Sequence, residues 1–339
     1  MLLGSELMLE ESLETPVILK AADDNLRNEI DKEFGYLMDY IKGCSLSQIT
    51  DDIIRNLRLF KDTDISNYTA TIDYYNKYDY LWGKIRPESG IYELANNRAQ
   101  NLVEHRQDFE WLYTRLHDYR SKKVLLVILS YWLSSNYKPI VEIQEKLFHQ
   151  YFDFDLIRCS KDEVFVDIGA YIGDTMVDYV KRFGSDCYKK IYCYDISQEN
   201  IDFIEKNIEL FKLKNVIVNK KGVSDKSGNL YISSDVVSSV YTLKEQGTIK
   251  VPTVTVDDDI DTPVTFIKMD IEGGEEQALL GCQKKIQENH PKLALSAYHN
   301  HKDLWKLARI IDKFDPSYHF YLRYYGYPLV PTEYLLYAL

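Results

Sequence analysis

Residues 164–174, Val164-Phe-Val-Asp-Ile-Gly-Ala-Tyr-Ile-Gly-Asp174, decide the fold of this chain. The apolar run 164–166 has the composition of a buried β-strand and ends at the acidic residue Asp167. A turn from Gly169 to Gly173 follows, and a helical pattern then begins at Asp174. A strand, a glycine turn and a helix in this order are typical of the nucleotide-binding crevice of an open α/β sheet.

The acidic residue at the start of that helix indicates which nucleotide fits. The glycines are spaced G-x-x-x-G, whereas dinucleotide-binding turns have G-x-G-x-x-G. Asp174 lies where the helix N-terminus would otherwise bind a pyrophosphate, and its carboxylate would repel one. S-adenosylmethionine has no phosphate and carries an ammonium and a sulfonium, which suit Asp167 and Asp174. The turn therefore favours a methyltransferase over a dehydrogenase.

Composition and charge indicate a folded protein without a general affinity for nucleic acid. The chain has 339 residues, of which 45% are hydrophobic, and its net charge is −12, whereas binding to a phosphate backbone needs clustered Lys and Arg. The five cysteines form no C-x-x-C pair, so we expect reduced thiols and a cytoplasmic location. The longest apolar run, Val124–Leu133, is about half the length of a membrane span. We therefore expect a buried helix there and no transmembrane segment.

The chain divides into two regions of different pattern. Residues 1–150 predict a mainly helical domain, because apolar residues recur at helical spacing in 24–41, 46–60 and 92–117. Ser121 is expected to cap a further helix that ends at Leu133. This domain could cover an acceptor pocket, form a homodimer interface or dock to partners, and the sequence leaves these roles open.

Residues 151–339 alternate between predicted strands and helices. We expect parallel strands at 164–167, 190–195, 216–220, 264–269 and 293–298, with helices at 175–183, 198–210, 275–289 and 302–314, and a final antiparallel hairpin at 319–325 and 334–339. This pattern predicts an α/β fold, a doubly wound Rossmann-like sheet with helices on both faces. It is the chain plan of a class I methyltransferase.

Ligands of open α/β sheets bind outside the carboxyl ends of the strands. The first strand supplies the turn described above, and the second ends at Asp195, an acidic residue placed to hold both ribose hydroxyls. The third strand is followed by residues placed to contact adenine. The expected cofactor-binding residues are Asp167, Gly169, Ala170, Gly173, Asp174, Asp195, Ser197, Val223, Ser224, Asp225 and Asp270.

Several ordered motifs in residues 151–339 resemble the FkbM family of S-adenosylmethionine-dependent methyltransferases. They are Val251-Pro-Thr-Val-Thr-Val-Asp-Asp258, Thr265-Phe-Ile-Lys-Met-Asp-Ile-Glu-Gly-Gly-Glu-Glu276, Pro291-Lys-Leu-Ala-Leu-Ser-Ala-Tyr-His299, Leu322-Arg-Tyr-Tyr325 and Glu333-Tyr-Leu-Leu-Tyr337. The resemblance implies S-adenosylmethionine as cofactor and O-methylation of a sugar, glycan or secondary-metabolite hydroxyl. The family usually has Glu-Pro after the second strand, where this chain has Asp195-Ile-Ser197, so the reach of the acidic residue toward the ribose is shorter.

A hydroxyl acceptor needs a base near the methyl group, because a neutral hydroxyl is a poor nucleophile. His299 is our first choice, since imidazole titrates near neutrality, and Asp270 could orient the acceptor or be the base itself. Glu272 either accepts backbone N–H groups around Gly273 or lines the acceptor site. His299, Asp270 and Glu272 could also hold a divalent cation, but no spacing is decisive and we assign no metal ligands.

Two other functions remain open at this point. One is an NAD(P)-dependent oxidoreductase, which Asp174 and the missing third glycine disfavour. The other is a non-catalytic S-adenosylmethionine-binding scaffold in a glycan biosynthesis assembly, whose helical region recruits partners.

Overall fold

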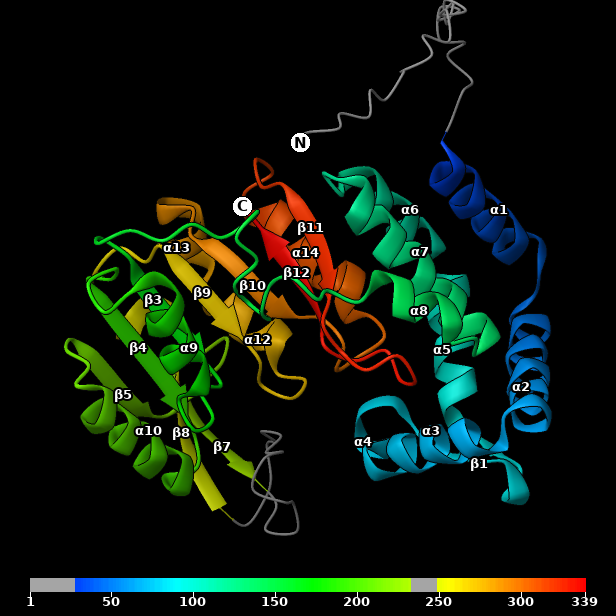
Figure 1. Ribbon diagram of the computed structural model, residues 1–339, viewed down its shortest axis with the longest axis horizontal. Helices are drawn as coiled ribbons and strands as arrows, with labels where there is room; N and C mark the ends of the chain where they lie inside the picture. The colour runs from blue at the N-terminus through cyan, green and yellow to red at the C-terminus, as the bar shows by residue number, and fades with distance from the viewer. Residues whose placement is uncertain (1–27, 233–248) are drawn as a thin grey trace, which may run out of the picture.

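The structure is a computed structural model that describes residues 28–232 and 249–339 (Figure 1). Ser238 and Ser239, which the sequence places in a loop that either closes over the acceptor or merely connects two elements, lie outside the described residues. The main sheet has seven strands in the order β11-β12-β10-β9-β3-β4-β5. Five of them are parallel neighbours: β10 (Lys292–Ser296), β9 (Phe266–Met269), β3 (Val164–Ile168), β4 (Lys190–Asp195) and β5 (Val216–Lys220).

The C-terminal hairpin closes one side of this sheet. β12 (Tyr334–Ala338) lies antiparallel to β10 and also to β11 (Phe320–Tyr324), so the last strand of the chain is inserted between the two preceding it. The strands β3, β10 and β12 are almost wholly buried, as expected of strands covered on both faces, whereas β5 at the sheet edge is only partly buried. The predicted fold class, a mostly parallel doubly wound sheet with an antiparallel C-terminal hairpin, is confirmed.

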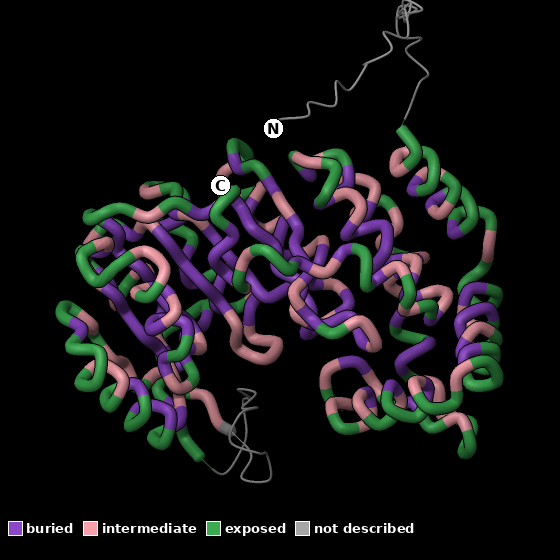
Figure 2. The backbone as a smooth tube through the Cα atoms, viewed as in Figure 1, coloured by how far each residue is buried: buried purple, intermediate pink, exposed green. Residues whose placement is uncertain are grey.

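Helices cover both faces of the main sheet (Figures 1 and 2). On one face, α9 (Asp174–Phe183) and α10 (Gln198–Phe211) share a buried apolar cluster with Phe165, Ile191 and Phe266. On the other face, α12 (Glu275–Leu280), α13 (Gln283–Asn289) and α14 (Asp303–Phe314) pack against alternate strand residues such as Val166, Ile267 and Leu295. Successive strand side chains point to opposite faces, which is why neighbouring residues enter different clusters.

A small second sheet adjoins the third parallel strand. It contains β6 (Gly222–Val223), β8 (Ile249–Val254) and β7 (Gly228–Ile232) in that order, and the short helix α11 (Val256–Asp259) follows β8. Asp257 of α11 accepts hydrogen bonds from the backbone N–H groups of Lys284 and Lys285 at the start of α13. This sheet brings residues 223–225 to the same edge as the ends of β3 and β4.

The N-terminal region is mainly helical in its described part, and it packs against the hairpin side of the sheet (Figure 1). Its elements are α1 (Glu29–Gly43), α2 (Leu46–Thr63), α3 (Ile65–Lys77), α4 (Asp79–Trp82), β1 (Ile85–Arg86), the 3-10 turn Pro87–Ser89, β2 (Ile91–Tyr92), α5 (Glu93–Glu104), α6 (Arg106–Arg115), α7 (Tyr119–Ser134) and α8 (Lys138–Ile143).

These helices and the sheet share one apolar cluster rather than two separate ones. The helix α7 carries the apolar run 124–133 and is buried along most of its length. Backbone hydrogen bonds from His117 to Phe320 and from Glu145 to Tyr324 cover the outer edge of β11, which would otherwise be open to pairing. A domain boundary at residue 150 stays a prediction. Among the described residues, no helix is long and apolar enough to cross a membrane.

Three expected helices differ from prediction for local reasons. The span 92–117 is two helices that meet at His105, and 275–289 is also broken, between α12 and α13. At that break a Cβ on Gly281 would lie 2.0 Å from the carbonyl oxygen of Ser224, so only glycine permits this approach. The cap of α7 is Asp118, not Ser121, because the Asp118 side chain accepts from the Ser121 N–H.

Candidate active site

A single pocket of about 780 Å³ lies at the carboxyl ends of the parallel strands. Its walls come from the turn after β3, the end of β4, the segment after β6, the loop between β9 and α12, and the chain just before β12. Of the predicted site residues, the pocket is lined by Gly169, Asp174, Asp195, Val223, Ser224, Asp225, Asp270 and Glu272. The structure therefore brings the ends of successive strands together, as the sequence predicted.

The glycine turn at one end of the pocket depends on two positions that only glycine occupies without strain. Gly169 has a φ of +79°, and a Cβ there would lie 1.8 Å from the carbonyl oxygen of Asp270. Gly173 has a φ of +80° and immediately precedes α9. The backbone N–H groups of Gly169 and Ala170 both donate to the carbonyl of Tyr194, which fixes the turn to the end of β4.

Asp167 lies beneath this turn rather than in the pocket wall. Its side chain is fully buried, and the Nζ atom of Lys268 lies 3.0 Å from its carboxylate and also donates to the Gly169 carbonyl at 2.7 Å. Burial raises the pKa of Asp167 to about 6, although the neighbouring Lys268 ammonium opposes that rise. The ion pair thus supports the turn from within the sheet.

Asp195 occupies the end of β4 and faces the pocket. One carboxylate oxygen accepts from the Tyr171 N–H of the glycine turn, and the other accepts from the Ser197 N–H and the Asn200 side chain. Burial raises the pKa of Asp195, and these hydrogen bonds counteract that rise. Ser197 does not line the pocket, because its hydroxyl caps α10 by accepting from the Asn200 N–H.

Residues 223–225 form a third wall beyond β6. The Ser224 N–H donates to the carbonyl of Val254, and the Ser224 hydroxyl donates to the Asp225 carboxylate at 3.1 Å. The backbone of Gly281 in the α12–α13 break presses against Ser224 from behind. This wall is therefore held on two sides.

The other end of the pocket is acidic. Asp270, Glu272 and Glu333 all line it. The hydroxyl of Tyr151 donates to Asp270 at 2.7 Å, and Glu333 accepts from the Tyr298 hydroxyl at 3.0 Å. Burial raises the pKa of Glu272 to about 7, while the positive charge of His299 acts in the opposite direction.

Four non-glycine residues with positive φ lie in the wall of this pocket: Tyr151 (+68°), Tyr171 (+48°), Glu272 (+58°) and Glu333 (+60°). Such conformations cost free energy and persist only where the surrounding structure enforces them. The concentration of strained backbone at one cavity is typical of a functional site.

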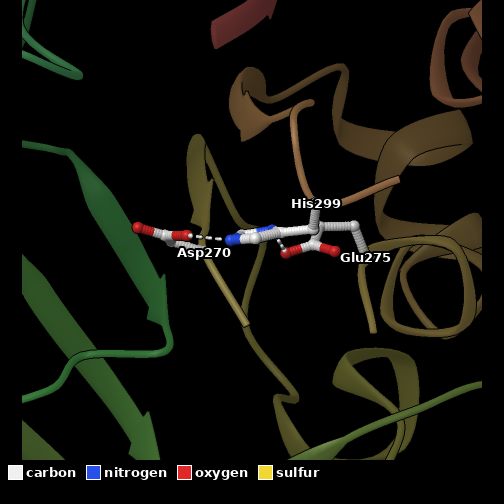
Figure 3. Close-up of side chains that lie close together, drawn as sticks. All are labelled: Asp270, Glu275 and His299. Carbon is white, nitrogen blue, oxygen red and sulfur yellow. Dashed lines mark hydrogen bonds and ion pairs between the residues drawn. The ribbon is translucent and has the colours of Figure 1, made fainter. Parts of the chain in front are cut away.

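His299 does not line the pocket; its imidazole lies between Asp270 and Glu275 (Figure 3). Its Nδ1 atom is 2.9 Å from a carboxylate oxygen of Glu275, while its Nε2 atom is 3.6 Å from Asp270 and 3.6 Å from Glu272. Burial lowers the pKa of His299, but these three carboxylates outweigh it and raise the pKa to about 10. An imidazole that keeps its proton cannot accept another, so the predicted role of His299 as base requires that something displace this proton.

Two further basic residues, His301 and Arg323, lie outside the pocket. His301 is buried and stacks edge-on against Trp132 of α7, with ring centroids 5.0 Å apart. Arg323 is buried and pairs with Asp153 and Asp118 at 2.8 Å each. Both residues therefore have structural partners.

Comparison with known proteins identifies the fold around this pocket. Residues 167–329 match the family model described as the methyltransferase FkbM domain. The crystal structure of Methyltransferase FkbM from Methylobacillus flagellatus KT is 26% identical with a TM-score of 0.62, and the match covers 72% of this chain. Residues 167–329 therefore belong to the FkbM methyltransferase family. The match spans 62% of the Methylobacillus protein, so this chain corresponds to less than two thirds of that protein's length.

Two further solved structures are more distant. An rRNA methylase from Streptococcus thermophilus is 12% identical with a TM-score of 0.37, covering 53% of this chain and 87% of that one. A protein from Streptococcus mutans described as a methyltransferase, solved in complex with SAH, is 15% identical with a TM-score of 0.34, covering 53% of this chain and 91% of that one. Neither similarity is close enough to carry an argument about function. No curated protein sequence matches the chain.

The cofactor of an FkbM methyltransferase domain is S-adenosylmethionine, and the residues of this pocket fit it. Gly169 and the partly buried Asp195 both line the pocket, the Asp195 carboxylate offers hydrogen-bond acceptors there, and S-adenosylmethionine has no phosphate that would have to lie against Asp174. The strand-end residues were predicted from the sequence. Tyr151, Gln150, Tyr298 and Glu333 were not, although Glu333 opens one of the motifs that carry the family resemblance.

Proposed function

We propose that this FkbM-family protein is an O-methyltransferase that methylates a hydroxyl group of a sugar, a glycan or a secondary metabolite. The observation that carries the proposal is the single pocket, because it joins a cofactor crevice at Gly169 and Asp195 to an acidic, hydrogen-bonding end at Asp270. A carboxylate and a tyrosine hydroxyl are groups that bind and orient an acceptor hydroxyl.

At the cofactor end, the role of this chain's residues is to bind S-adenosylmethionine and to orient it. We expect the Asp195 carboxylate to accept hydrogen bonds from the two ribose hydroxyls, and residues 223–225 to contact adenine, because all of them line the pocket. When bound, S-adenosylmethionine would supply the methyl group for transfer to the acceptor oxygen and would leave as S-adenosylhomocysteine. Asp174 at the start of α9 adds negative charge near that cation.

At the acceptor end, the hydroxyl proton must be removed as the new bond forms. Asp270 faces the pocket and is held by the Tyr151 hydroxyl, whereas His299 lies behind it and reaches the pocket only past Asp270 and Glu272. This geometry favours the Asp270 carboxylate as the group next to the acceptor. His299 is then a positioning residue, whose charge acts on the Asp270 and Glu272 carboxylates that line the pocket.

Two contacts of the N-terminal region support the proposal that this region covers the acceptor. The indole N–H of Trp82 in α4 donates to the backbone carbonyl of Tyr298 at 2.8 Å, and a Cβ on Gly273 would lie 4.0 Å from Leu81. Helix α4 therefore lies against the acidic end of the pocket. We propose that it contributes to acceptor selection. A homodimer through this region and a cytoplasmic location stay predictions.

The experiment is transfer of an isotopically labelled methyl group from S-adenosylmethionine to a panel of hydroxyl acceptors, with amines and thiols as competitors. NMR of the product locates the new methyl group. We expect an O-methyl product, and in Asp270→Asn a rate lower by about 10²–10⁴-fold with retained cofactor binding. Asp178→Asn is the matched control, since Asp178 lies on α9 and pairs with Arg182 outside the pocket. Methylation of nitrogen or sulfur acceptors alone would overturn the proposal.

A further inference from the structure

We propose that the acidic end of the pocket binds one divalent metal ion through Nε2 of His299 and the carboxylates of Asp270 and Glu272. The binding itself is independent of the proposed function. What the ion would do, holding the acceptor hydroxyl, rests on that function.

The first observation is the unpartnered Nε2 atom of His299. The side chain is 1% exposed, and Nε2 has no hydrogen-bond partner although two carboxylates face it. Both distances are 3.6 Å, longer than a hydrogen bond. Ligand atoms about 2.1 Å from one metal, at angles of 90–120°, lie roughly 3.0–3.6 Å apart. Each of the two carboxylates therefore lies at the distance from Nε2 that two ligands of one ion would have, which is longer than a hydrogen bond.

The second observation is the contact on the other ring nitrogen. Glu275 is buried and lies 2.9 Å from Nδ1. A carboxylate that accepts the Nδ1 proton fixes the tautomer with a free lone pair on Nε2, and this is how metal-binding histidines are usually oriented. Figure 3 shows the imidazole between Asp270 and Glu275. Asp270, Glu275 and His299 lie close enough together to share an ion, but Glu275 already accepts from the Ile271 N–H and contacts Nδ1. We therefore place the ion on the Nε2 side and take Glu275 as the positioning residue.

The third observation is local charge. Asp270, Glu272 and Glu333 line the same end of the pocket, and the nearby ammonium of Lys268 already pairs with Asp167. An ion on Nε2 would neutralise part of this negative charge. Two oxygens and one imidazole suit Mn²⁺, Fe²⁺ or Zn²⁺.

The position of the ion also indicates a class of acceptor. Asp270 and Glu272 line the pocket while His299 does not, so the open coordination positions would face the acceptor space. Two adjacent hydroxyls could occupy them together. We therefore expect acceptors with neighbouring hydroxyl groups to be preferred over isolated alcohols.

The test is titration of the full-length metal-free protein with Mn²⁺, followed by calorimetry and by electron spin-echo spectroscopy. We expect one Mn²⁺ per chain with a nitrogen coupling from imidazole. His299→Gln should remove the coupling and weaken binding at least tenfold, and Glu272→Gln, a substitution at a partly exposed side chain, should weaken binding without loss of the fold. Glu275→Gln should weaken it by about 10–100-fold while the coupling persists.

Glu276→Gln is the matched control, because Glu276 is on the same helix as Glu275 but pairs with Lys306 outside the pocket. It should bind Mn²⁺ like the unsubstituted protein. Binding of S-adenosylhomocysteine shows that each variant is folded. Absence of Mn²⁺ and Zn²⁺ binding, or binding unchanged in His299→Gln, would overturn the metal site. Full methyl transfer in the presence of a chelator would overturn the role of the ion in the reaction and leave the proposed function standing. Mn²⁺ binding without methyl transfer to any hydroxyl would overturn the proposed function and leave the metal site standing.

Discussion

Substitution of Gly169 by alanine tests whether the glycine turn and the β9 segment approach as closely as described. A Cβ on Gly169 would lie 1.8 Å from the Asp270 carbonyl oxygen, and real Cβ contacts are essentially never below 3.0 Å. The two backbone segments would have to separate by at least 1.2 Å, the difference between these values. The backbone at Gly169 has a φ of +79°, which alanine adopts only with strain.

Gly184 provides the matched control, because it separates strain from overlap. It has a φ of +96°, but nothing lies within 4 Å of its Cβ position. Gly184→Ala should therefore cost only the backbone strain, about 1–3 kcal/mol of unfolding free energy. Gly169→Ala adds the forced separation of two packed backbones, typically another 1–3 kcal/mol or more. We expect a total loss of about 4 kcal/mol for Gly169→Ala.

The assays are urea denaturation followed by circular dichroism, and calorimetric titration with S-adenosylhomocysteine where each variant is folded. Gly169→Ala should lose S-adenosylhomocysteine binding, since the turn and Asp270 move together, and Gly184→Ala should keep it. If Gly169→Ala is no less stable than Gly184→Ala and binds S-adenosylhomocysteine as tightly as the unsubstituted protein, the described contact between the two segments is wrong.

Three further predictions address the ribose position, an ion pair and the helical region. Asp195→Ala should weaken S-adenosylhomocysteine binding by about 10–100-fold, since hydrogen bonds to a charged group contribute about 1.5–3 kcal/mol; unchanged calorimetric affinity would contradict the assignment. Burial alone would raise the pKa of Asp118, but hydrogen bonds from Arg323 hold it below its usual value. The pair of Asp118 with Arg323 therefore stabilises the folded protein above about pH 4, where the carboxyl group of the unfolded chain is ionised. This stabilisation is lost as the pH falls through the lower pKa that Asp118 has in the folded protein. Asp118→Asn should cost about 2 kcal/mol at pH 7 and progressively less toward pH 3 in urea titrations, and a loss that is constant with pH would count against the pair. Trp82→Phe removes the hydrogen bond to Tyr298 and should cost about 1–3 kcal/mol in the same assay while S-adenosylhomocysteine still binds; loss of that binding would mean that α4 supports the cofactor end instead.

The cofactor end of the site could be predicted because its residues follow local patterns. The strands Lys190–Asp195 and Val216–Lys220 were predicted with the bounds that the structure has. A buried parallel strand is an apolar run, and its carboxyl end is marked in the sequence by the first polar residue after it. Asp195 could be placed by that rule alone.

The acceptor end could not be predicted in the same way, because it is assembled from distant segments. Tyr151 precedes the first strand and Glu333 precedes the last, yet both line the pocket beside Asp270. No spacing in the sequence relates them, and their positive φ values follow from tertiary packing. The partner of His299 was also missed, because Glu275 precedes it by 24 residues and lies in a different element.

Asp167 was expected to line the cofactor pocket, but its carboxylate is buried beneath the glycine turn. The sequence showed an acidic residue at the end of a strand but not that Lys268, on the adjacent strand β9, would pair with it. A buried carboxylate needs such a partner, since an isolated buried charge is strongly unfavourable. The ion pair therefore shapes the turn that the cofactor would contact.

The most direct test of the account is calorimetric titration of the pure protein with S-adenosylhomocysteine and, separately, with NADH. We predict micromolar binding of S-adenosylhomocysteine at one site per chain and no binding of NADH, because Asp174 and the open turn suit a cofactor without a pyrophosphate. Binding of NADH, or no binding of S-adenosylhomocysteine by the folded protein, would contradict the account.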